Sequence, residues 1–186
     1  MPHSFDPEHA DFQSAVLGLR RGDFSRLAPL FSAPAGRRAP IMTWVDQGRF
    51  ASDPVSLNEA LACACFLGHT DAAEYLLAHG ADLVAGAGTG LNGFHWGANR
   101  GQLDTVLALI RLGMPLEIPN SYGGTVLGGT VWAAIHEPRA SHLAILEALL
   151  QAGARVEAAE YPSGNAAVDA LLCRYGAMAP DPRSET

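Results

Sequence analysis

The side chains of this sequence best suited to metal binding or nucleophilic chemistry are those of its 7 histidines and 3 cysteines. Proteins hold metal ions with clusters of such residues at short, paired spacings. Cys63 and Cys65 are one residue apart inside a predicted helix, so their side chains diverge. No second Cys or His pair at zinc spacing follows them. We interpret both cysteines as small buried residues and predict no metal site.

The histidines form one weak constellation. His136 and His142 flank a predicted loop that carries Glu137, and such a set could bind a metal ion or transfer a proton. We favour a purely structural role for the three residues. His69 and His79 lie near opposite ends of another predicted helix and its approach, which does not favour a shared site.

The catalytic patterns of common enzymes are missing from the sequence. No nucleophile is paired with a base, and no acidic pair recurs at a fixed spacing. The segment 86–90 is rich in glycine, but it falls where a turn between helices is predicted. We therefore expect no catalytic residue and no cofactor.

The composition indicates one folded domain with a polar surface. A chain of 186 residues with 48% hydrophobic content is long enough to bury a core. Its net charge of −7 disfavours a nucleic-acid partner, which requires a clustered basic face. The two adjacent arginine pairs, at 20–21 and 37–38, are interpreted as solvated, with a phosphate contact as the less favoured alternative.

Several features predict a cytoplasmic protein. An odd number of cysteines is typical of a reducing compartment. The first residues lack the basic start and apolar core of a signal peptide, and no run of 18 apolar residues could span a membrane. We expect a monomer that binds no membrane. All 12 basic residues are arginine, and the sequence is rich in Ala and Gly, which favours a bacterial source.

Two stretches of the sequence correspond without a gap. Gly68 recurs as Gly101, and Gly80 recurs as Gly113, at an offset of 33 residues in both cases. A fixed period of this size is typical of stacked supersecondary units, none of which can bury its apolar face alone. Helical spacing of apolar residues on both sides of each glycine indicates pairs of helices, near 58–67 and 71–79 in the best-defined unit.

The segment 92–102, Asn-Gly-Phe-His-Trp-Gly-Ala-Asn-Arg-Gly-Gln, carries the most specific local pattern. It resembles the ankyrin-repeat signature T-P-L-H-x-A-A-x-x-G-H. His95 falls on the family's histidine, Phe94 on its leucine and Ala98 on its second alanine. Asn92 replaces the threonine, and its amide can still cap the helix. The resemblance implies that the imidazole of His95 is structural and bridges a turn and a helix.

A second match to the family surrounds Thr125, with Gly128 in place of the histidine. This unit is longer than the period, because 40 residues separate Gly113 from the corresponding Gly153. Pro138 stops a helix, so the additional residues are expected between the two helices of the unit.

The resemblance implies an all-α ankyrin-repeat solenoid of stacked helix-turn-helix units with protruding turns or β-hairpins. We expect a single domain over residues 1–177, and the first unit begins with a helix capped at Asp6. The expected segments are units at 6–31, 57–85, 90–118 and 120–157, a C-terminal half-unit at 164–177, an insertion at 32–54 that packs over a neighbouring unit, and a disordered tail at 178–186.

Ankyrin repeats use the concave face formed by inner helices and protruding turns to bind proteins, and this resemblance implies a binding face here. Aromatic residues and arginine are enriched at the energetic centres of such interfaces. For Trp132 we favour a role in packing between units over contact with a partner. For Trp96 the two roles are equally favoured. The candidate partner-binding residues are Phe66, Trp96, Asn99, Arg100, Asn120, Tyr122, Trp132 and Tyr161.

The leading hypothesis is a non-enzymatic module that binds one partner protein of unknown identity. A narrower alternative is an immunity protein or inhibitor that masks a toxin or enzyme, for which a compact acidic domain is suitable. The third hypothesis is an enzyme that uses the segment 32–54 and the loop 136–142. It is the least favoured, because neither segment carries a catalytic pattern.

Overall fold

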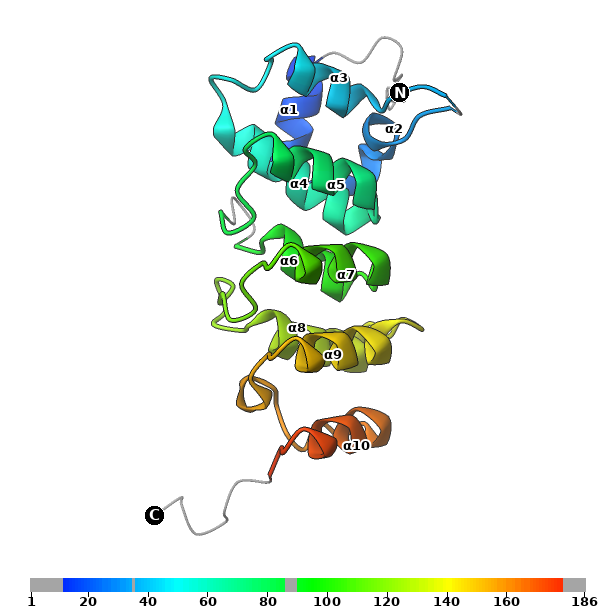
Figure 1. Ribbon diagram of the computed structural model, residues 1–186, viewed down its shortest axis with the longest axis vertical. Coiled ribbons are helices and arrows are strands. Elements are labelled where there is room, and N and C mark those ends of the chain that lie inside the picture. Colours follow the sequence, from blue (N-terminus) through cyan, green and yellow to red (C-terminus); the bar gives the residue numbers. More distant parts are fainter. Residues whose placement is uncertain (1–11, 35, 86–89, 179–186) are drawn as a thin grey trace.

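A computed structural model of the protein describes residues 12–34, 36–85 and 90–178. Within these ranges the chain forms ten α-helices, two short 3-10 helices and no strand (Figure 1). The prediction of an all-α fold is confirmed. In the described parts of the connections between units, the chain forms turns and no β-hairpin.

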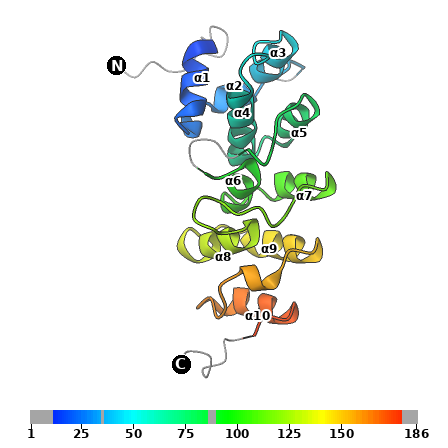
Figure 2. The ribbon, with the colours of Figure 1, turned by 90° about the vertical axis from the view of Figure 1, so that its left-hand side faces the viewer.

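The α-helices form two columns that run the length of the molecule (Figure 2). The inner helices are α1 (Phe12–Arg20), α4 (Pro54–Leu67), α6 (Gly93–Asn99) and α8 (Val126–His136). The outer helices are α3 (Pro40–Asp46), α5 (Thr70–Ala78), α7 (Leu103–Arg111) and α9 (His142–Gln151). Each helix packs on the next one in its column, and α10 (Ala166–Arg174) packs against α9 at the C-terminal end.

The first unit differs from the prediction. The segment 32–54, expected to be an insertion outside the repeats, contains α3, which packs on α5 as the outer helix of this unit. Pro40 begins α3, because a proline at the first helical position loses no hydrogen bond. Ile41 and Trp44 then bury their side chains in the core.

The last part of the unit expected at 6–31 is a 3-10 turn (Phe24–Arg26) followed by the four-residue helix α2 (Ala28–Phe31). The helix cap expected at Asp6 and the tail beyond Met178 lie outside the described residues.

The central units agree closely with the sequence. The helices predicted at 58–67 and 71–79 correspond to α4 and α5. Gly80 and Gly113, which follow the outer helices α5 and α7, have φ angles of +92° and +70°. Glycine adopts this left-handed region without the steric penalty of a Cβ atom.

The fourth unit contains its additional residues between the two helices, as predicted. α8 extends to His136, and a loop containing Pro138 precedes α9. Side chains fasten this loop to the preceding unit: the Ser141 hydroxyl donates a hydrogen bond to the Gly101 carbonyl oxygen at 2.5 Å.

One continuous hydrophobic core runs through the stack. Ala60, Ala64 and Ala98 are completely buried, and their small side chains allow the inner helices to approach closely. Phe94 and Leu127 are also completely buried and fill the spaces between units. No helix in the described part of the chain is long and apolar enough to cross a membrane.

Candidate protein-binding face

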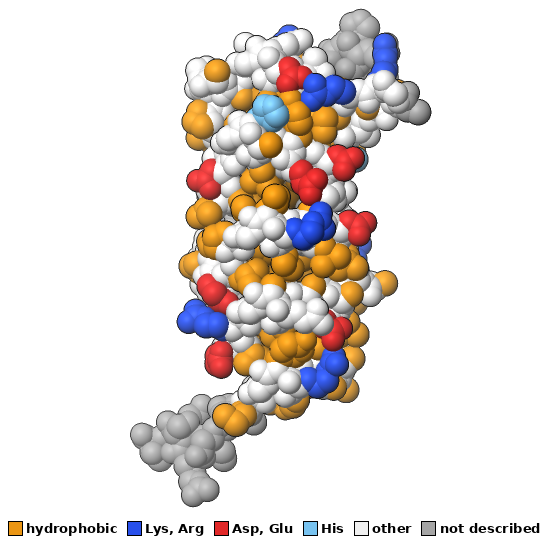
Figure 3. Space-filling model, in the orientation of Figure 1, with side chains coloured by type: hydrophobic (Ala, Val, Ile, Leu, Met, Phe, Trp, Pro, Cys, Tyr) orange, Lys and Arg blue, Asp and Glu red, His pale blue; other side chains and the backbone are white. Residues whose placement is uncertain are grey.

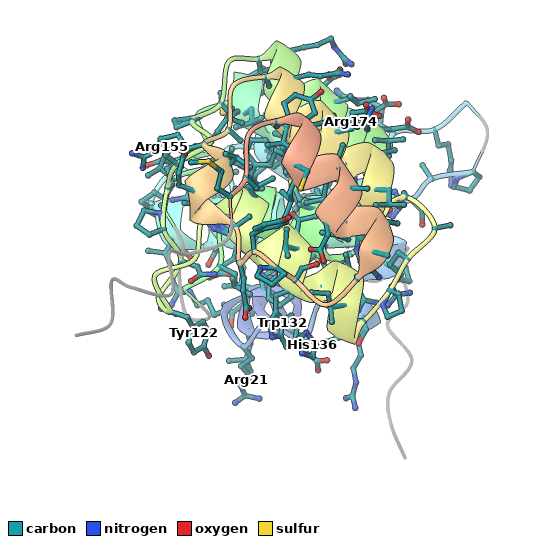
Figure 4. The ribbon with its side chains drawn as sticks, turned by 90° about the horizontal axis from the view of Figure 1, so that it is seen from below. Arg21, Tyr122, Trp132, His136, Arg155 and Arg174 are labelled. Atoms are coloured by element: carbon teal, nitrogen blue, oxygen red, sulfur yellow. The ribbon has the colours of Figure 1, made fainter. Side chains whose placement is uncertain are left out.

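The candidate site lies on the face formed by the inner helices. Figure 4 looks along the stack from its C-terminal end and shows that Arg21, Tyr122, Trp132 and His136 project to this side. Arg174 of α10 projects away from it. The outer helices form the opposite face, over which acidic and basic side chains are scattered (Figure 3).

A cavity of about 500 Å³ opens between α8 and the segment that joins α7 to α8, which we call the α7–α8 finger (residues 112–125). One wall is formed by residues from turns: Leu91, Asn120, Tyr122 and Gly124. The opposite wall is formed by residues from the inner helices: Asn99, Gly128, Gly129 and Trp132. None of these side chains is charged.

Hydrogen bonds hold the α7–α8 finger in shape. Asn120 Oδ1 accepts hydrogen bonds from the backbone N–H groups of Tyr122 and Gly124, at 2.9 Å and 3.0 Å. The Asn120 N–H in turn donates to the Gly124 carbonyl oxygen at 2.8 Å. This local pairing is a turn of the kind that asparagine favours. It leaves the Tyr122 side chain 88% exposed.

Three residues of the helical wall, Gly128, Gly129 and Trp132, belong to α8. Thr125 caps this helix by accepting a hydrogen bond from the Gly128 N–H at 3.3 Å. Gly128 and Gly129 lie four and three residues before Trp132, so each of them is on the same side of the helix as Trp132. The Trp132 ring is 52% exposed and stacks on His136 with ring centroids 4.6 Å apart.

The two glycines of this wall differ in their surroundings. A Cβ atom at Gly128 would lie 2.5 Å from the carbonyl oxygen of Ala158, so no side chain fits there. A Cβ atom at Gly129 would lie 3.4 Å from Asn99 Oδ1, which is an ordinary contact distance. Gly128 is thus required by close backbone packing, whereas Gly129 leaves space open in the cavity.

Two polar atoms on this side of the molecule are buried without a hydrogen-bond partner among the described residues, namely Asn99 Oδ1 and Trp96 Nε1. Such groups are uncommon in folded proteins, because an unpaired buried polar atom costs free energy. Asn99 also lines the cavity, although its Oδ1 atom is itself shielded from solvent.

His95 supports the cavity from behind. It is completely buried near the start of α6. Its backbone N–H donates a hydrogen bond to Asn92 Oδ1 at 3.0 Å. The ring places Nδ1 2.8 Å from Asn92 Oδ1 and Nε2 3.2 Å from the Gly124 carbonyl oxygen. Burial lowers the pKa of His95. The predicted bridge between turn and helix is confirmed, and the Asn92 amide caps the helix as expected.

Phe66 and Trp96 belong to a separate aromatic cluster between the first three units. The half-buried Trp96 ring meets the rings of Phe24 and Phe66 edge to face, with centroids 5.9 Å and 5.2 Å apart. The guanidinium carbon of Arg100 lies 4.7 Å from the Phe66 ring centroid, and one Arg100 nitrogen lies 4.0 Å from Glu137. These residues join units rather than line the cavity.

The structure therefore separates the eight candidate residues. Asn99, Asn120, Tyr122 and Trp132 line one cavity, whereas Tyr161 does not and instead places its hydroxyl 2.8 Å from Cys173 Sγ. The interpretation of Trp132 as a core residue is wrong, because its ring is exposed.

Leu91 and the three glycines that line the cavity were not among the residues predicted from the sequence. The one available signal was Gly128, which occupies the position of the family's histidine. A glycine at that position indicates that something else approaches the helix closely.

His142, Cys63 and Cys65, three of the residues considered for metal binding or catalysis, are buried in the protein. The buried His142 accepts a hydrogen bond from the Arg139 N–H at Nδ1 and donates from Nε2 to the Asn99 carbonyl oxygen, both at 3.2 Å. Burial raises the pKa of the Cys65 thiol to about 12 and also raises that of Cys63, so both are poor nucleophiles. Within the described ranges, no three metal-binding side chains come together.

Comparison with known proteins agrees with this architecture. The family model of the ankyrin repeat matches residues 58–86, which include most of α4 and all of α5. No curated protein matches the chain. The matched repeat supports an ankyrin-repeat protein, and the helix pairs stacked on it are consistent with an all-α ankyrin-repeat fold. Ankyrin repeats generally mediate binding to other proteins and are generally not catalytic.

Proposed function

We propose that the chain is a non-enzymatic interaction module that binds one partner protein through its inner-helix face, with the cavity beside Trp132 at the centre of the contact. The observation that carries this proposal is the exposure of Tyr122 and Trp132. Among the Phe, Tyr and Trp residues of the described ranges, only these two are exposed, and both line the same cavity.

Exposure of these two rings favours binding over folding as their role. Burial of an aromatic side chain stabilises a contact by removing apolar surface from water. Tyr and Trp are also enriched among the residues that dominate the free energy of binding. The exposed aliphatic residues Leu17 and Leu107 belong to other elements, and scattered exposure of this kind is common.

The outer-helix face supplies a contrast. Its charged residues pair across neighbouring helices: an Arg111 nitrogen lies 3.3 Å from a Glu74 oxygen, and an Arg174 nitrogen lies 3.3 Å from a Glu147 oxygen. These ion pairs are exposed and contribute little to stability. We assign this face no role in binding.

We further propose that the protein acts as a monomer in the cytoplasm. Cys63, Cys65 and Cys173 are free thiols, which suits a reducing compartment.

Affinity capture tests the proposed function. The tagged protein, a Tyr122→Ala/Trp132→Ala variant and a Glu74→Arg/Arg111→Glu variant are incubated with extract of the source organism, and captured proteins are identified by mass spectrometry. We expect one protein to be retained by the wild type and the outer-face variant and lost with the cavity variant. Capture by the cavity variant at the wild-type level would exclude this face as the binding site.

A further inference from the structure

We propose that the cavity receives one uncharged, apolar side chain from an extended segment of the partner, and that Asn99 and Asn120 form hydrogen bonds with the backbone of that segment. This inference rests on the proposed function, because it assumes a protein partner on the inner-helix face. It adds the chemistry of the group that is bound.

The cavity walls select against charge. Charged residues make up 17% of the sequence, yet none of them lines the cavity. A charged group buried there would lose its hydration without meeting an opposite charge. The nearby Arg100 and Glu137 face each other at 4.0 Å, so neither is left as a counter-charge.

The walls also favour an apolar group of substantial size. Tyr122 and Trp132 both line the cavity with large rings, and Gly129 contributes no side chain to it. A volume of about 500 Å³ accommodates a large side chain together with its peptide group. Aromatic walls of this kind bind apolar and aromatic groups through dispersion and burial of surface.

The two asparagines match the backbone of an extended segment. Asn120 Oδ1 already accepts two hydrogen bonds from its own finger, so Nδ2 is the group left to donate to a ligand. The Asn99 side-chain amide forms no hydrogen bond within the described part of the chain, so it can turn its shielded oxygen towards the cavity when a ligand binds. A peptide group carries one acceptor and one donor, which Asn120 and Asn99 respectively can pair.

Capped amino acids test the charge selection, because each carries one side chain between two peptide groups. N-acetyl-phenylalaninamide and N-acetyl-leucinamide are compared with the N-acetyl amides of aspartic acid and lysine in titrations of ¹⁵N-labelled protein. The signals followed by NMR are the Trp132 indole N–H and the side-chain NH₂ groups of Asn99 and Asn120.

We expect the two apolar probes to shift these signals and to bind at least about tenfold more tightly than the two charged probes. Equal binding of charged and apolar probes would overturn the inference. So would the absence of any shift with the apolar probes at millimolar concentrations.

The role of the asparagines requires a probe without a peptide group. Toluene is titrated alongside N-acetyl-phenylalaninamide into the wild type and an Asn99→Leu variant, which keeps a side chain of similar size. We expect the variant to bind the capped amino acid severalfold more weakly and toluene at least as well. Equal affinity of wild type and variant for the capped amino acid would exclude backbone recognition and leave an apolar site for small molecules.

A Gly129→Leu variant is designed to fill the cavity and keep the fold. Only ordinary contact is met at the Cβ position, and leucine is a better helix former than glycine. We expect an unchanged circular dichroism spectrum and loss of probe binding. If this variant unfolds, Trp132→Ala replaces it, with the same expectation; retained binding in the folded variant would contradict the inference.

The outcomes for the two proposals are distinct. Failure of the probes, together with partner capture that depends on Tyr122 and Trp132, would overturn the cavity chemistry and leave the proposed function. Selective probe binding, together with partner capture that ignores these two residues, would overturn the proposed function and leave a selective cavity.

Discussion

The imidazole of His95, at the start of α6, lies with Nε2 3.2 Å from the carbonyl oxygen of Gly124 in the finger of the next unit. This contact joins two successive units through residues that are 29 positions apart in the chain. It also holds the turned segment on which Tyr122 is presented. Stability and the shape of the cavity therefore depend on the same buried side chain.

Replacement of His95 by Ala should destabilise the protein by about 1–3 kcal/mol, because it leaves a cavity and unpairs buried polar groups. Chemical denaturation followed by circular dichroism measures the change. His79→Ala is the matched control: His79 is exposed, and its replacement should change the free energy of unfolding by less than about 0.5 kcal/mol. Similar losses in both variants would contradict the bridging role.

The protein should lose stability as the pH falls below neutral. Burial lowers the pKa of His69, His95 and His142 from 6.5 in each case. The unfolded chain therefore takes up protons at a higher pH than the folded chain. The resulting stability is fully present above pH 6.5 and declines as the pH falls from 6.5 towards the pKa of the folded state.

His142→Gln tests this effect at one residue. Glutamine can still donate to the Asn99 carbonyl oxygen, but it does not titrate. Melting temperatures between pH 7.5 and 5 should fall less steeply for the variant than for the wild type. Parallel pH profiles would show that His142 does not contribute.

Glu59 should be destabilising at neutral pH. It is 3% exposed on α4 and forms no hydrogen bond or ion pair with another described residue, and burial raises its pKa above 4.5. A raised pKa contributes stability below pH 4.5, which is lost as the pH rises through the pKa of the folded state. Glu59→Gln should therefore raise the melting temperature at pH 7.5 by a few degrees. The gain should shrink at pH 4.5, and an equal gain at both values would contradict the electrostatic cause.

Adjacent glycines of α8 should respond oppositely to alanine. Gly128→Ala places a methyl group 2.5 Å from the Ala158 carbonyl oxygen, which should cost about 1–3 kcal/mol. Gly129→Ala meets only an ordinary contact and should stabilise the helix by about 0.5–1 kcal/mol. Urea denaturation of both variants provides the comparison. Equal effects would mean that helix propensity alone decides the outcome.

The repeat units could be predicted where local patterns decide the structure. Gly80 and Gly113 predicted where two outer helices end. Pro138 predicted the loop between the two helices of the fourth unit. α3 could not be predicted in this way, because its sequence does not match the repeat. Its place as an outer helix depends on packing against α5.

The candidate site was only partly predictable for a related reason. Trp96 and Trp132 both occur on inner helices, and their environments depend on distant residues. Phe24 of the first unit packs on Trp96, whereas Trp132 stacks on His136 of its own helix and stays exposed. The cavity also requires Gly128 and Gly129, whose contribution is an absence of side chains. Neither effect has a local signature in the sequence.

The most direct test of partner binding on the inner-helix face is titration calorimetry with the captured, purified partner. Tyr122→Ala and Trp132→Ala should each weaken binding by about 1–3 kcal/mol and leave the melting temperature almost unchanged. Glu74→Arg/Arg111→Glu, on the outer face, should bind with wild-type affinity. Loss of binding in this outer-face variant, with wild-type affinity in both cavity variants, would contradict the proposed function.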